Sequence, residues 1–438
     1  MHAAKGIIIA APNSGSGKTV FTTGLIGAMA KTGLKVAAAK TGPDYIDTSF
    51  LGITAKSPAI NLDPWSMEER RTKALASAHA ANADLLVVEG VMGLFDGAVD
   101  GTGATGDLAA MLELPVLFVV DAARQSQSVG ALISGFANWR KGVNIAGIIL
   151  NNVASARHEN ILKKAIQQLD IPLVGVLRRD QNLQVPSRHL GLVLAGEIEQ
   201  INEFSAAASA LVASGVDLDL VRSLAAPLPQ APIQTPARLK PLGQHIAIAR
   251  DAAFAFIYEH WLADWRAGGA ELSFFSPLAN HPPAPEADAI FLPGGYPELH
   301  GAQLSAAHDF FKALLAARDR GALIYGECGG YMVLGKSLRD KNGVTHKMSG
   351  LLPHQTYIDR PRRVLGYRRL QHGSALPWPN RLMAHEFHYS TSSAHDLPPL
   401  FEACDALGKK LDPMGAVDKN VMGSYAHIID GVAGGEKQ

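Results

Sequence analysis

The amino-acid sequence predicts an α/β protein of two domains, each built on an open, mostly parallel sheet. The chain has 438 residues, about the length of two ordinary domains. Short apolar runs of strand length alternate with helix-like stretches, as expected where helices cover both faces of a parallel sheet. Five prolines between residues 225 and 243 interrupt this alternation, which is typical of a linker. We therefore expect domains at 1–224 and 244–438, joined by residues 225–243.

The elements follow in order along the chain. Residues 6–12 form a β-branched run typical of a buried strand, and residues 20–33 have helical periodicity and end at a glycine. The further strand-like runs of the first domain are KVAAAKTG, DLLVVEG, PVLFVVDA, IAGIILNNV and PLVGVLRR. After the linker the same alternation restarts with HIAIARD, a helical stretch around 255–269, ADAIFLPGGY and GALIYGECGG. The second domain is therefore expected to have its own parallel sheet and its own site.

The composition excludes several classes of protein. Lys+Arg and Asp+Glu balance at 40 each, which gives no general attraction to nucleic acid or to an anionic membrane. No apolar run reaches the roughly 18–20 residues that a membrane span needs. The N-terminal apolar run leads directly into a glycine loop, unlike a signal peptide. The two cysteines, Cys328 and Cys404, exclude a disulfide framework, and a cytoplasmic protein is expected.

A phosphate-binding loop is predicted between the first strand and the first helix, where the sequence reads APNSGSGKT. Its residues are Ser14, Gly15, Ser16, Gly17, Lys18 and Thr19. Lys18 is expected to reach the β- and γ-phosphates of ATP, and Thr19 to bind Mg²⁺. The standard spacing would place a glycine at Pro12, and the loop is similar instead to the longer variant of dethiobiotin synthetase. A chance glycine-rich turn is the alternative interpretation.

Acidic residues follow two of the predicted strands. Glu89 closes DLLVVEG at the edge where open α/β sheets bind ligands, so it is a candidate Mg²⁺ ligand. Asp44 and Asp47 follow the strand that contains Lys40, and both can face the phosphates. Alternatively, Asp44 only caps a helix. Asp96, in GLFDG, is either a catalytic group or a turn aspartate before a glycine.

A thiol site is predicted in the second domain, where a strand leads into Gly-Glu-Cys-Gly-Gly and then a helix. This pattern is typical of a nucleophile elbow with cysteine in place of serine, and we expect the helix N-terminus to lower the pKa of Cys328. His427 is the candidate base, and Gly294 or Gly295 can supply oxyanion-hole N–H groups. His385 and His388 are alternative bases or metal ligands, and Cys404 is interpreted as a structural cysteine.

These motifs together resemble the cobyrinate a,c-diamide synthase family, including its hydrogenobyrinate-specific members. The matching segments are APNSGSGKT, KTGPDYIDTSF, NLDPW, LLVVEGVMGLFDG, VVDAARQSQS, LPGGYPEL, YGECGGYMVLG and GSYAH. They run across nearly the whole chain in the family's order. The resemblance implies a dethiobiotin-synthetase-like domain followed by a class I glutamine amidotransferase domain.

The resemblance also implies the chemistry, which belongs to cobalamin biosynthesis. MgATP phosphorylates the c and a acetate carboxylates of cobyrinate or hydrogenobyrinate, and ammonia from L-glutamine displaces each phosphate after crossing inside the protein. Cys328 carries the glutamyl thioester and His427 is its base. Lys18, Thr19 and Glu89 fall on nucleotide and magnesium positions. The positions linked to substrate and ATP use are Asp44, Tyr45, Asp47 and Asp96, to which we add Lys40 as a substrate residue and Asp47 as a metal ligand. The family is compatible with a homodimer.

The sequence departs from the class I pattern beside the proposed base. Class I enzymes usually have a glutamate two residues after the histidine, whereas this chain has Ile429 followed by Asp430. Because isoleucine cannot orient an imidazole, Asp430 or a backbone carbonyl is expected to do so. Unchanged glutaminase activity in Asp430→Asn would exclude a role for that carboxylate.

The sequence is also compatible with other functions. The same architecture can act on nickel sirohydrochlorin or serve as a cobyrate synthase. The P-loop can instead drive an ATPase switch with a non-catalytic C-terminal binding domain, or the glutaminase can be inactive with ammonia supplied from outside. Arg124 and the cluster Arg360, Arg362 and Arg363 are candidates for substrate carboxylates, although a solvated basic loop is the alternative for the cluster.

Overall fold

The computed structural model describes residues 4–180, 183, 201–229, 238–359 and 361–432. The chain divides into two compact units, 1–235 and 236–438. Within the proline-rich stretch at 225–243, residues 230–237 lie outside the described residues. Before it, strand β8 (Ala226–Pro227) pairs antiparallel with β1 of the first sheet. The boundaries predicted at 224 and 244 stay a prediction.

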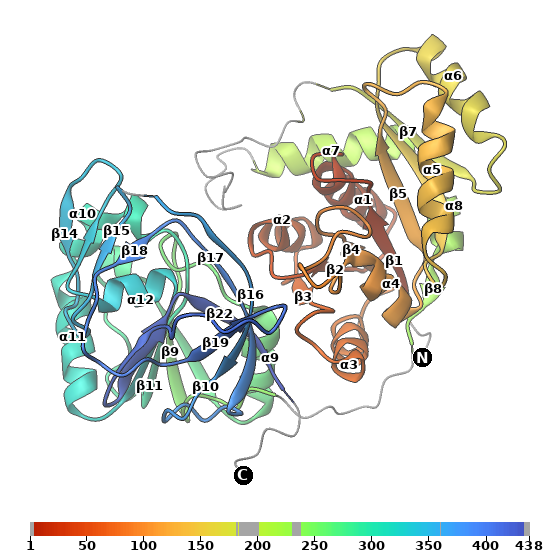
Figure 1. Cartoon of the computed structure of the whole chain (residues 1–438). Coiled ribbons are helices and arrows are strands. Elements are labelled where there is room, and N and C mark those ends of the chain that lie inside the picture. Colours follow the sequence, from red (N-terminus) through yellow and green to blue (C-terminus); the bar gives the residue numbers. More distant parts are fainter. Residues whose placement is uncertain (1–3, 181–182, 184–200, 230–237, 360, 433–438) are drawn as a thin grey trace. The chain divides into compact units, whose positions relative to one another are not determined.

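The N-terminal unit contains the parallel sheet that the sequence predicts, with the strand order β3-β2-β4-β1-β5-β6-β7 (Figure 1). All pairs along this order are parallel. Its strands are β1 (Lys5–Ala10), β2 (Val36–Thr41), β3 (Ile60–Leu62), β4 (Leu85–Glu89), β5 (Val116–Asp121), β6 (Ile145–Val153) and β7 (Leu173–Arg178). The central strands are buried on both faces, which explains why they read as continuous apolar runs.

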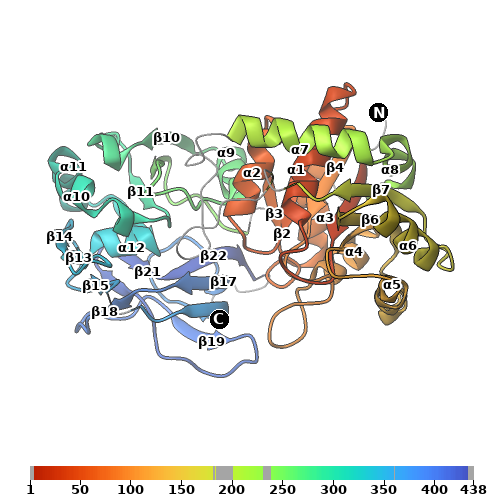
Figure 2. The ribbon, with the colours of Figure 1, turned by 90° about the horizontal axis from the view of Figure 1, so that it is seen from above.

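Helices cover both faces of this sheet, and each face has its own apolar core (Figures 1 and 2). One core is built with helices α1 (Lys18–Lys31), α2 (Ile46–Ala55), α7 (Ile201–Gly215) and α8 (Leu218–Leu224). The other core is built with α3 (Glu69–His79), α4 (Thr105–Leu112), α5 (Ser128–Trp139) and α6 (Ala156–Ile166). Because all seven strands run the same way, their carboxyl ends meet at one edge, where a ligand site is expected.

The C-terminal unit also has a mostly parallel sheet, with the order β10-β9-β11-β12-β21-β20. Its strands are β9 (His245–Ala249), β10 (Glu271–Phe275), β11 (Ala289–Leu292), β12 (Leu323–Glu327), β20 (Ala416–Asp418) and β21 (Val421–Ser424), of which β20 alone is antiparallel. The packed helices are α9 (Glu259–Ala267), α10 (Gly301–Ser305), α11 (His308–Asp319) and α12 (Gly329–Leu334). The helix expected around 255–269 therefore begins at Glu259.

Two antiparallel or mixed sheets in this unit went unrecognised in the sequence. The first has the order β19-β16-β17-β22 and comprises β16 (Val364–Gln371), β17 (Arg381–His388), β19 (Glu402–Asp405) and β22 (Ala426–Gly431). The second comprises β13 (Ser337–Arg339), β14 (Thr345–Lys347), β15 (Gln355–Tyr357) and β18 (Thr391–Ser392). In β17 buried and less buried residues alternate, as in a strand with one covered face. His427, the predicted base, lies on β22 and thus on an antiparallel strand.

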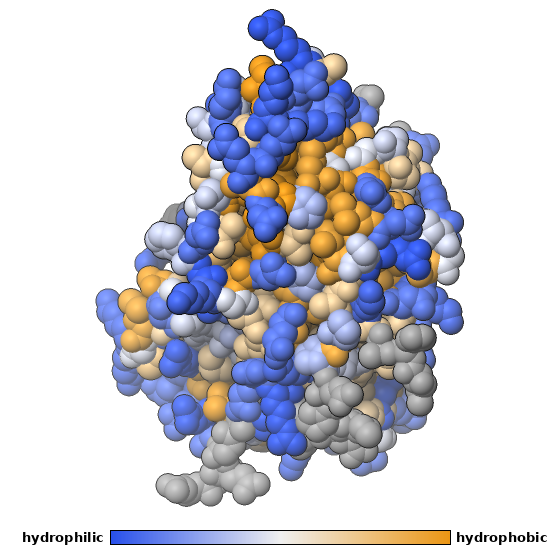
Figure 3. Space-filling view, turned by 90° about the vertical axis from the view of Figure 1, so that its right-hand side faces the viewer, coloured by the Kyte–Doolittle hydropathy of each residue, from blue (hydrophilic) through white to orange (hydrophobic). Residues whose placement is uncertain are grey.

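A broad hydrophobic area is visible on one face of the molecule (Figure 3). Among the described residues, the most exposed large apolar side chain is Trp139 at the end of α5, which is 76% exposed. Within the described part of the chain, no helix has the length and apolar character of a membrane span.

Candidate active sites

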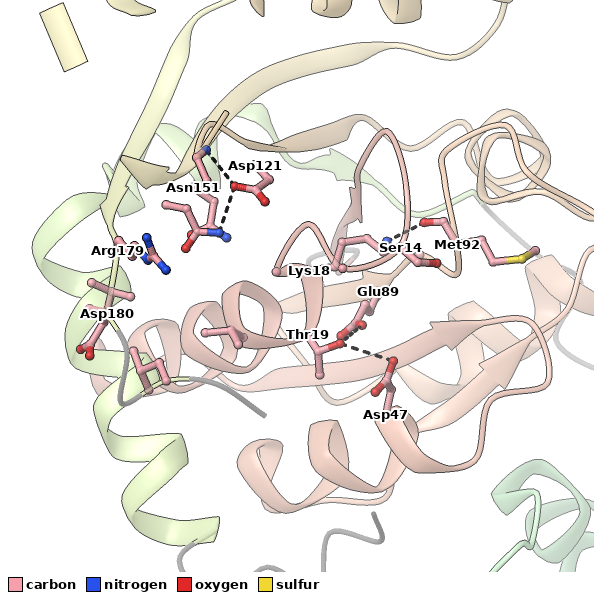
Figure 4. A pocket seen from close by; sticks show the side chains of 18 of the residues that line it. Ser14, Lys18, Thr19, Asp47, Glu89, Met92, Asp121, Asn151, Arg179 and Asp180 are labelled. Atoms are coloured by element: carbon pink, nitrogen blue, oxygen red, sulfur yellow. Dashed lines mark hydrogen bonds between the residues drawn. The ribbon is translucent and has the colours of Figure 1, made fainter. Parts of the chain in front are cut away.

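A cavity of about 980 Å³ opens at the carboxyl edge of the N-terminal sheet (Figure 4). Its walls come from the loop after β1, from the ends of β2, β4, β5, β6 and β7, and from α7. The lining residues that the sequence predicted are Ser14, Gly15, Gly17, Lys18, Thr19, Lys40, Asp44, Asp47, Glu89 and Arg124. The fold therefore brings most of the predicted nucleotide and substrate residues into one cavity.

The phosphate loop needs its glycines for conformational reasons. Gly15 and Gly17 have φ values of 79° and 88°, in the left-handed region that glycine tolerates. A side chain on Gly17 would also collide with the amide of Asn151, which donates to the carbonyl of Ser16 at 2.9 Å. The Ser16 hydroxyl donates to the carbonyl of Asn13 at 3.0 Å and closes the loop on itself.

Lys18 folds back over this loop. Its ammonium donates to the backbone carbonyls of Asn13 at 3.2 Å and Met92 at 2.5 Å. Burial, together with the positive charge of Lys40, lowers the pKa of Lys18 to about 8. Backbone carbonyls thus hold an ammonium group beside the place where phosphates would bind.

Lys40, Asp47 and Glu89 form a compact charged cluster beneath the loop. The Lys40 ammonium lies 2.5 Å from Asp47 Oδ2 and 2.7 Å from Glu89 Oε1. The Thr19 hydroxyl donates to Glu89 Oε1 at 2.8 Å and reaches Asp47 Oδ2 at 3.4 Å. Burial opposes the charge on Lys40, but the two carboxylates outweigh it and raise the pKa of Lys40 above its ordinary value.

The same cluster fits a Mg²⁺ ion. Its donors are a hydroxyl and two carboxylates, which are the oxygen ligands that this cation prefers. Glu89 is fully buried, and its Oε2 atom has no hydrogen-bond partner among the described residues. Burial raises the pKa of Glu89 to about 7, and the charge of Asp47 acts in the same direction, whereas Lys40 and the Thr19 hydroxyl only partly offset them. A divalent cation bound by Thr19, Asp47 and Glu89 would supply the missing compensation.

Of the other predicted substrate residues, Asp44 lines the cavity, whereas Asp96 makes a turn contact. Asp44 lines the cavity, and its Oδ1 also accepts from the backbone N–H groups of Ile46 and Asp47, so it caps the first turn of α2. Tyr45 is the next residue, at the start of α2. Asp96 is exposed and accepts from the Gly93 N–H at 3.0 Å, the turn contact that was its alternative interpretation.

Several cavity residues were missed in the sequence, although the strands that carry them were recognised. Asp121 ends β5, and Asn151 and Asn152 lie near the end of β6. Arg178 is the last residue of β7, and Arg179 follows it. Asn152 donates from its amide to Asp121 Oδ1 at 3.0 Å. The available signal was positional, because polar residues at the carboxyl ends of parallel strands meet at one edge.

In the C-terminal unit, Cys328 lies at a sharp turn between β12 and α12. Its backbone has φ 45° and ψ −103°, which is strained for a residue with a side chain. A side chain on Gly330 would collide with the carbonyl of Leu292, and one on Gly329 would press on Pro297 and Gly295. The elbow can therefore form only with glycines after the cysteine.

The pKa of this thiol corrects one expectation. Burial raises the pKa of Cys328 well above its ordinary value, and the nearby carboxyls of Glu298, Glu327 and Glu386 act in the same direction. The Gly329 N–H acts in the opposite direction but is outweighed. The first N–H of α12 therefore acts in the expected direction, but burial outweighs it, because Cys328 is only 4% exposed.

His427 and Cys328 flank the same backbone loop. A side chain on Gly294 would collide with the His427 imidazole, whereas Gly295 N lies beside Gly329 in the elbow. Burial lowers the pKa of His427 to about 3, so the ring is held neutral, as a base requires. Of the two predicted oxyanion donors, Gly295 lies nearer the elbow, and both roles stay predictions.

The alternative histidines lie on β17, where His385 is the direct cross-strand partner of His427 on β22. His385 and His388 are three residues apart, so strand alternation turns them to opposite faces and a shared metal ion is disfavoured. His388 forms a hydrogen bond with Glu386 Oε1 at 2.9 Å, and Glu386 Oε2 accepts from Arg368 at 2.7 Å. The described residues contain no group of three or more His, Cys, Asp and Glu side chains suited to a metal ion.

The remaining predicted groups are placed as follows. Cys404 lies on β19, an edge strand of the antiparallel sheet, whereas the elbow follows β12 of the parallel sheet. Arg362 and Arg363 are exposed before β16, and Arg360 lies outside the described residues. Asp430 is buried and accepts at Oδ1 from the Gly431 N–H at 3.0 Å.

The fold and these two sites define a P-loop nucleotide-binding unit joined to a glutamine amidotransferase unit of the cysteine type. Two family models match the units: a CobQ/CobB/MinD/ParA nucleotide binding domain over residues 7–193, and a CobB/CobQ-like glutamine amidotransferase domain over residues 245–431. The fold class predicted from the sequence is thereby confirmed.

Curated relatives match over nearly the whole chain. The hydrogenobyrinate a,c-diamide synthase of Sinorhizobium sp is 50% identical over 431 residues, which is 98% of this chain and 99% of the relative. The enzyme of the same name from Rhizobium meliloti (strain 1021) is 50% identical, covering 97% and 99%. That of Brucella abortus biovar 1 (strain 9-941) is 48% identical, covering 97% and 98%. The chain belongs to the hydrogenobyrinate a,c-diamide synthase family.

Proposed function

We propose that this protein is a glutamine-hydrolysing carbon–nitrogen ligase that amidates the a- and c-acetate carboxylates of hydrogenobyrinate in cobalamin biosynthesis. The observation that carries the proposal is the 50% identity with a hydrogenobyrinate a,c-diamide synthase over 98% of the chain. Both matched domains fit this activity, because one binds nucleotides and the other belongs to glutamine amidotransferases.

The proposed reaction in the N-terminal unit activates the carboxylate. A carboxylate oxygen takes the γ-phosphoryl group of ATP, ADP leaves, and ammonia then displaces phosphate from the acyl phosphate to give the amide. The loop N–H groups and Lys18 hold the phosphates. Mg²⁺, when bound by Thr19, Asp47 and Glu89, supplies neutralisation of the phosphate charge. Lys40 sets the charge of that carboxylate pair.

The proposed reaction in the C-terminal unit makes the ammonia. Cys328 attacks the side-chain amide carbon of glutamine while His427 accepts the thiol proton and passes it to the leaving ammonia. The Gly295 N–H lies beside the elbow, where it can stabilise the oxyanion. Water then hydrolyses the thioester to glutamate. Free ammonia is mostly ammonium at neutral pH, so release from glutamine provides the reactive form.

The test is mass spectrometry of the product formed from candidate tetrapyrroles with MgATP and glutamine. We expect hydrogenobyrinate to gain two amides, with two ATP and two glutamine consumed for each diamide. Amidation of cobyrinate or nickel sirohydrochlorin but not of hydrogenobyrinate would reassign the substrate and leave the chemistry intact. ATP hydrolysis without any amide would favour the switch with a non-catalytic binding domain and overturn the proposal.

The predicted homodimer is a separate question. The end of α5 with Trp139 is the surface to examine first, because tryptophan is highly buried on average and this one is 76% exposed. Sedimentation velocity of the wild type and of Trp139→Glu decides it, since a dimer formed through this face would dissociate in the variant.

A further inference from the structure

The sequence leaves open which group orients His427, because the class I position for a carboxylate is filled by Ile429. Ile429 is fully buried, and its backbone carbonyl accepts hydrogen bonds from His260 and Trp261 at 3.1 and 3.3 Å. Asp430 accepts from the Gly431 N–H. The Ile429 carbonyl is therefore engaged with His260 and Trp261.

A different carboxyl group lies beside the imidazole. Glu327 is the last residue of β12 and directly precedes Cys328 in the chain. Its Oε2 atom lies 3.9 Å from His427 Nδ1, and both side chains are at most 3% exposed. This distance exceeds a hydrogen bond, but catalytic contacts are often long without substrate and shorten in the complex.

The other oxygen of Glu327 fixes the orientation of the group. Glu327 Oε1 accepts from the Tyr325 hydroxyl at 2.9 Å and from the Ile428 N–H at 3.1 Å. Ile428 is the neighbour of His427, so one carboxyl group both holds the backbone of β22 and places its other oxygen beside the imidazole. The same short segment thus carries the nucleophile and a group aimed at its base.

Building on the proposed function, we propose that Glu327 is the positioning residue of this glutaminase. It orients the His427 imidazole and balances the positive charge that forms when His427 takes the proton of Cys328. It does so from β12, the strand that leads into the nucleophile, rather than from β22, the strand of the histidine.

The electrostatics of the site favour a paired arrangement. Burial raises the pKa of Glu327 to about 8 and lowers that of His427 to about 3, so each charge alone is costly. An imidazolium next to a carboxylate compensates both costs. The other groups that influence the pair are His385 and His388 of β17, which oppose a charge on His427, and the carboxyls of Glu298 and Glu386, which oppose the thiolate.

The test variant is Glu327→Gln, which keeps an oxygen for Tyr325 and Ile428 and turns its amide N–H toward the imidazole. In the serine-protease template, replacing the orienting carboxylate by its amide costs about 10⁴-fold in kcat. Because the contact here is longer, we expect glutaminase kcat to fall about 10- to 100-fold, with little change in KM for glutamine. Ammonia-dependent synthesis should stay within about twofold of wild type. Asp430→Asn is the matched control, and we expect it to resemble wild type.

Alkylation of Cys328 by iodoacetamide separates the two ways in which Glu327 can act. If it acts through the imidazole, Glu327→Gln destabilises the imidazolium–thiolate pair and alkylation at a given pH slows. If it only repels the thiolate directly, loss of the charge speeds alkylation, and that result overturns the proposal.

Two further results separate the role of Glu327 from the proposed function of the thiol. Wild-type kcat in Glu327→Gln, or a loss in Asp430→Asn alone, would also overturn the role of Glu327. Full glutamine-dependent synthesis in Cys328→Ala would instead contradict the proposed function of the thiol itself.

Discussion

In the N-terminal site opposite charges stand paired, whereas in the C-terminal site burial keeps the reactive groups neutral. Lys40 bridges Asp47 and Glu89 within 2.7 Å, next to an open cavity. Cys328 and His427, in contrast, have pKa values shifted away from their charged forms. Phosphoryl transfer handles permanent polyanions, so standing charges are useful there. Thiol chemistry needs a thiolate and an imidazolium only during the reaction, so burial keeps Cys328 and His427 neutral before substrate binds.

The strongest way to break this comparison is to remove the nucleophile. Cys328→Ala should lose glutamine-dependent synthesis by about 10⁴-fold or more, because no other thiolate can form the thioester. Synthesis with ammonium chloride should persist, since the charged N-terminal site is untouched. Product assays with each nitrogen source check this, and loss of both activities would show that Cys328 also supports the other reaction.

The converse variant removes a standing charge. Lys18→Ala should lower synthesis about 10²–10³-fold with either nitrogen source, as expected when one preorganised charge at a transferring phosphoryl group is lost. Lys31→Ala, at the exposed end of the same helix, is the control and should behave as wild type. If Lys18→Ala kept synthesis with ammonium and lost it only with glutamine, the lysine would act on nitrogen delivery instead.

The raised pKa of Cys328 predicts how the alkylation rate of this thiol depends on pH. Because the folded pKa of Cys328 is raised, the thiolate fraction grows about tenfold per pH unit through pH 8 and 9 without a plateau. Iodoacetamide inactivation rates in Cys404→Ser, measured by mass spectrometry of the Cys328 peptide, check this. A plateau near pH 7 would indicate a standing thiolate and remove the contrast between the sites.

The smallest effect is expected from the other cysteine. Cys404→Ser should change both activities by less than about twofold, because Cys404 lies on β19 and contacts no group of the elbow in the described hydrogen bonds. Full protection of this variant against iodoacetamide would identify Cys404 as the reactive thiol instead.

Much of the architecture could be predicted because its signals are local. The alternation of apolar runs and helices predicted both parallel sheets. The loop from Ser14 to Thr19 was recognised by its glycines and by its place between a strand and a helix. The sheet that contains β16 and β17 escaped recognition because polar residues, among them Arg368, Glu386 and His388, occupy buried positions of these strands. Strand pairing between distant segments leaves little trace in a single sequence.

The sequence by itself determined which chemical groups exist: a phosphate loop, a cysteine between glycines, and a histidine about 100 residues later. The tertiary structure decided how they are charged and supported. It placed Lys40 between two carboxylates, collected Asp121 and Asn151 at the cavity, raised the pKa of Cys328, and set Glu327 beside His427. The physical reason is that burial and charge pairing depend on segments far apart in the chain, whereas glycine turns and strand-to-helix junctions depend on neighbours.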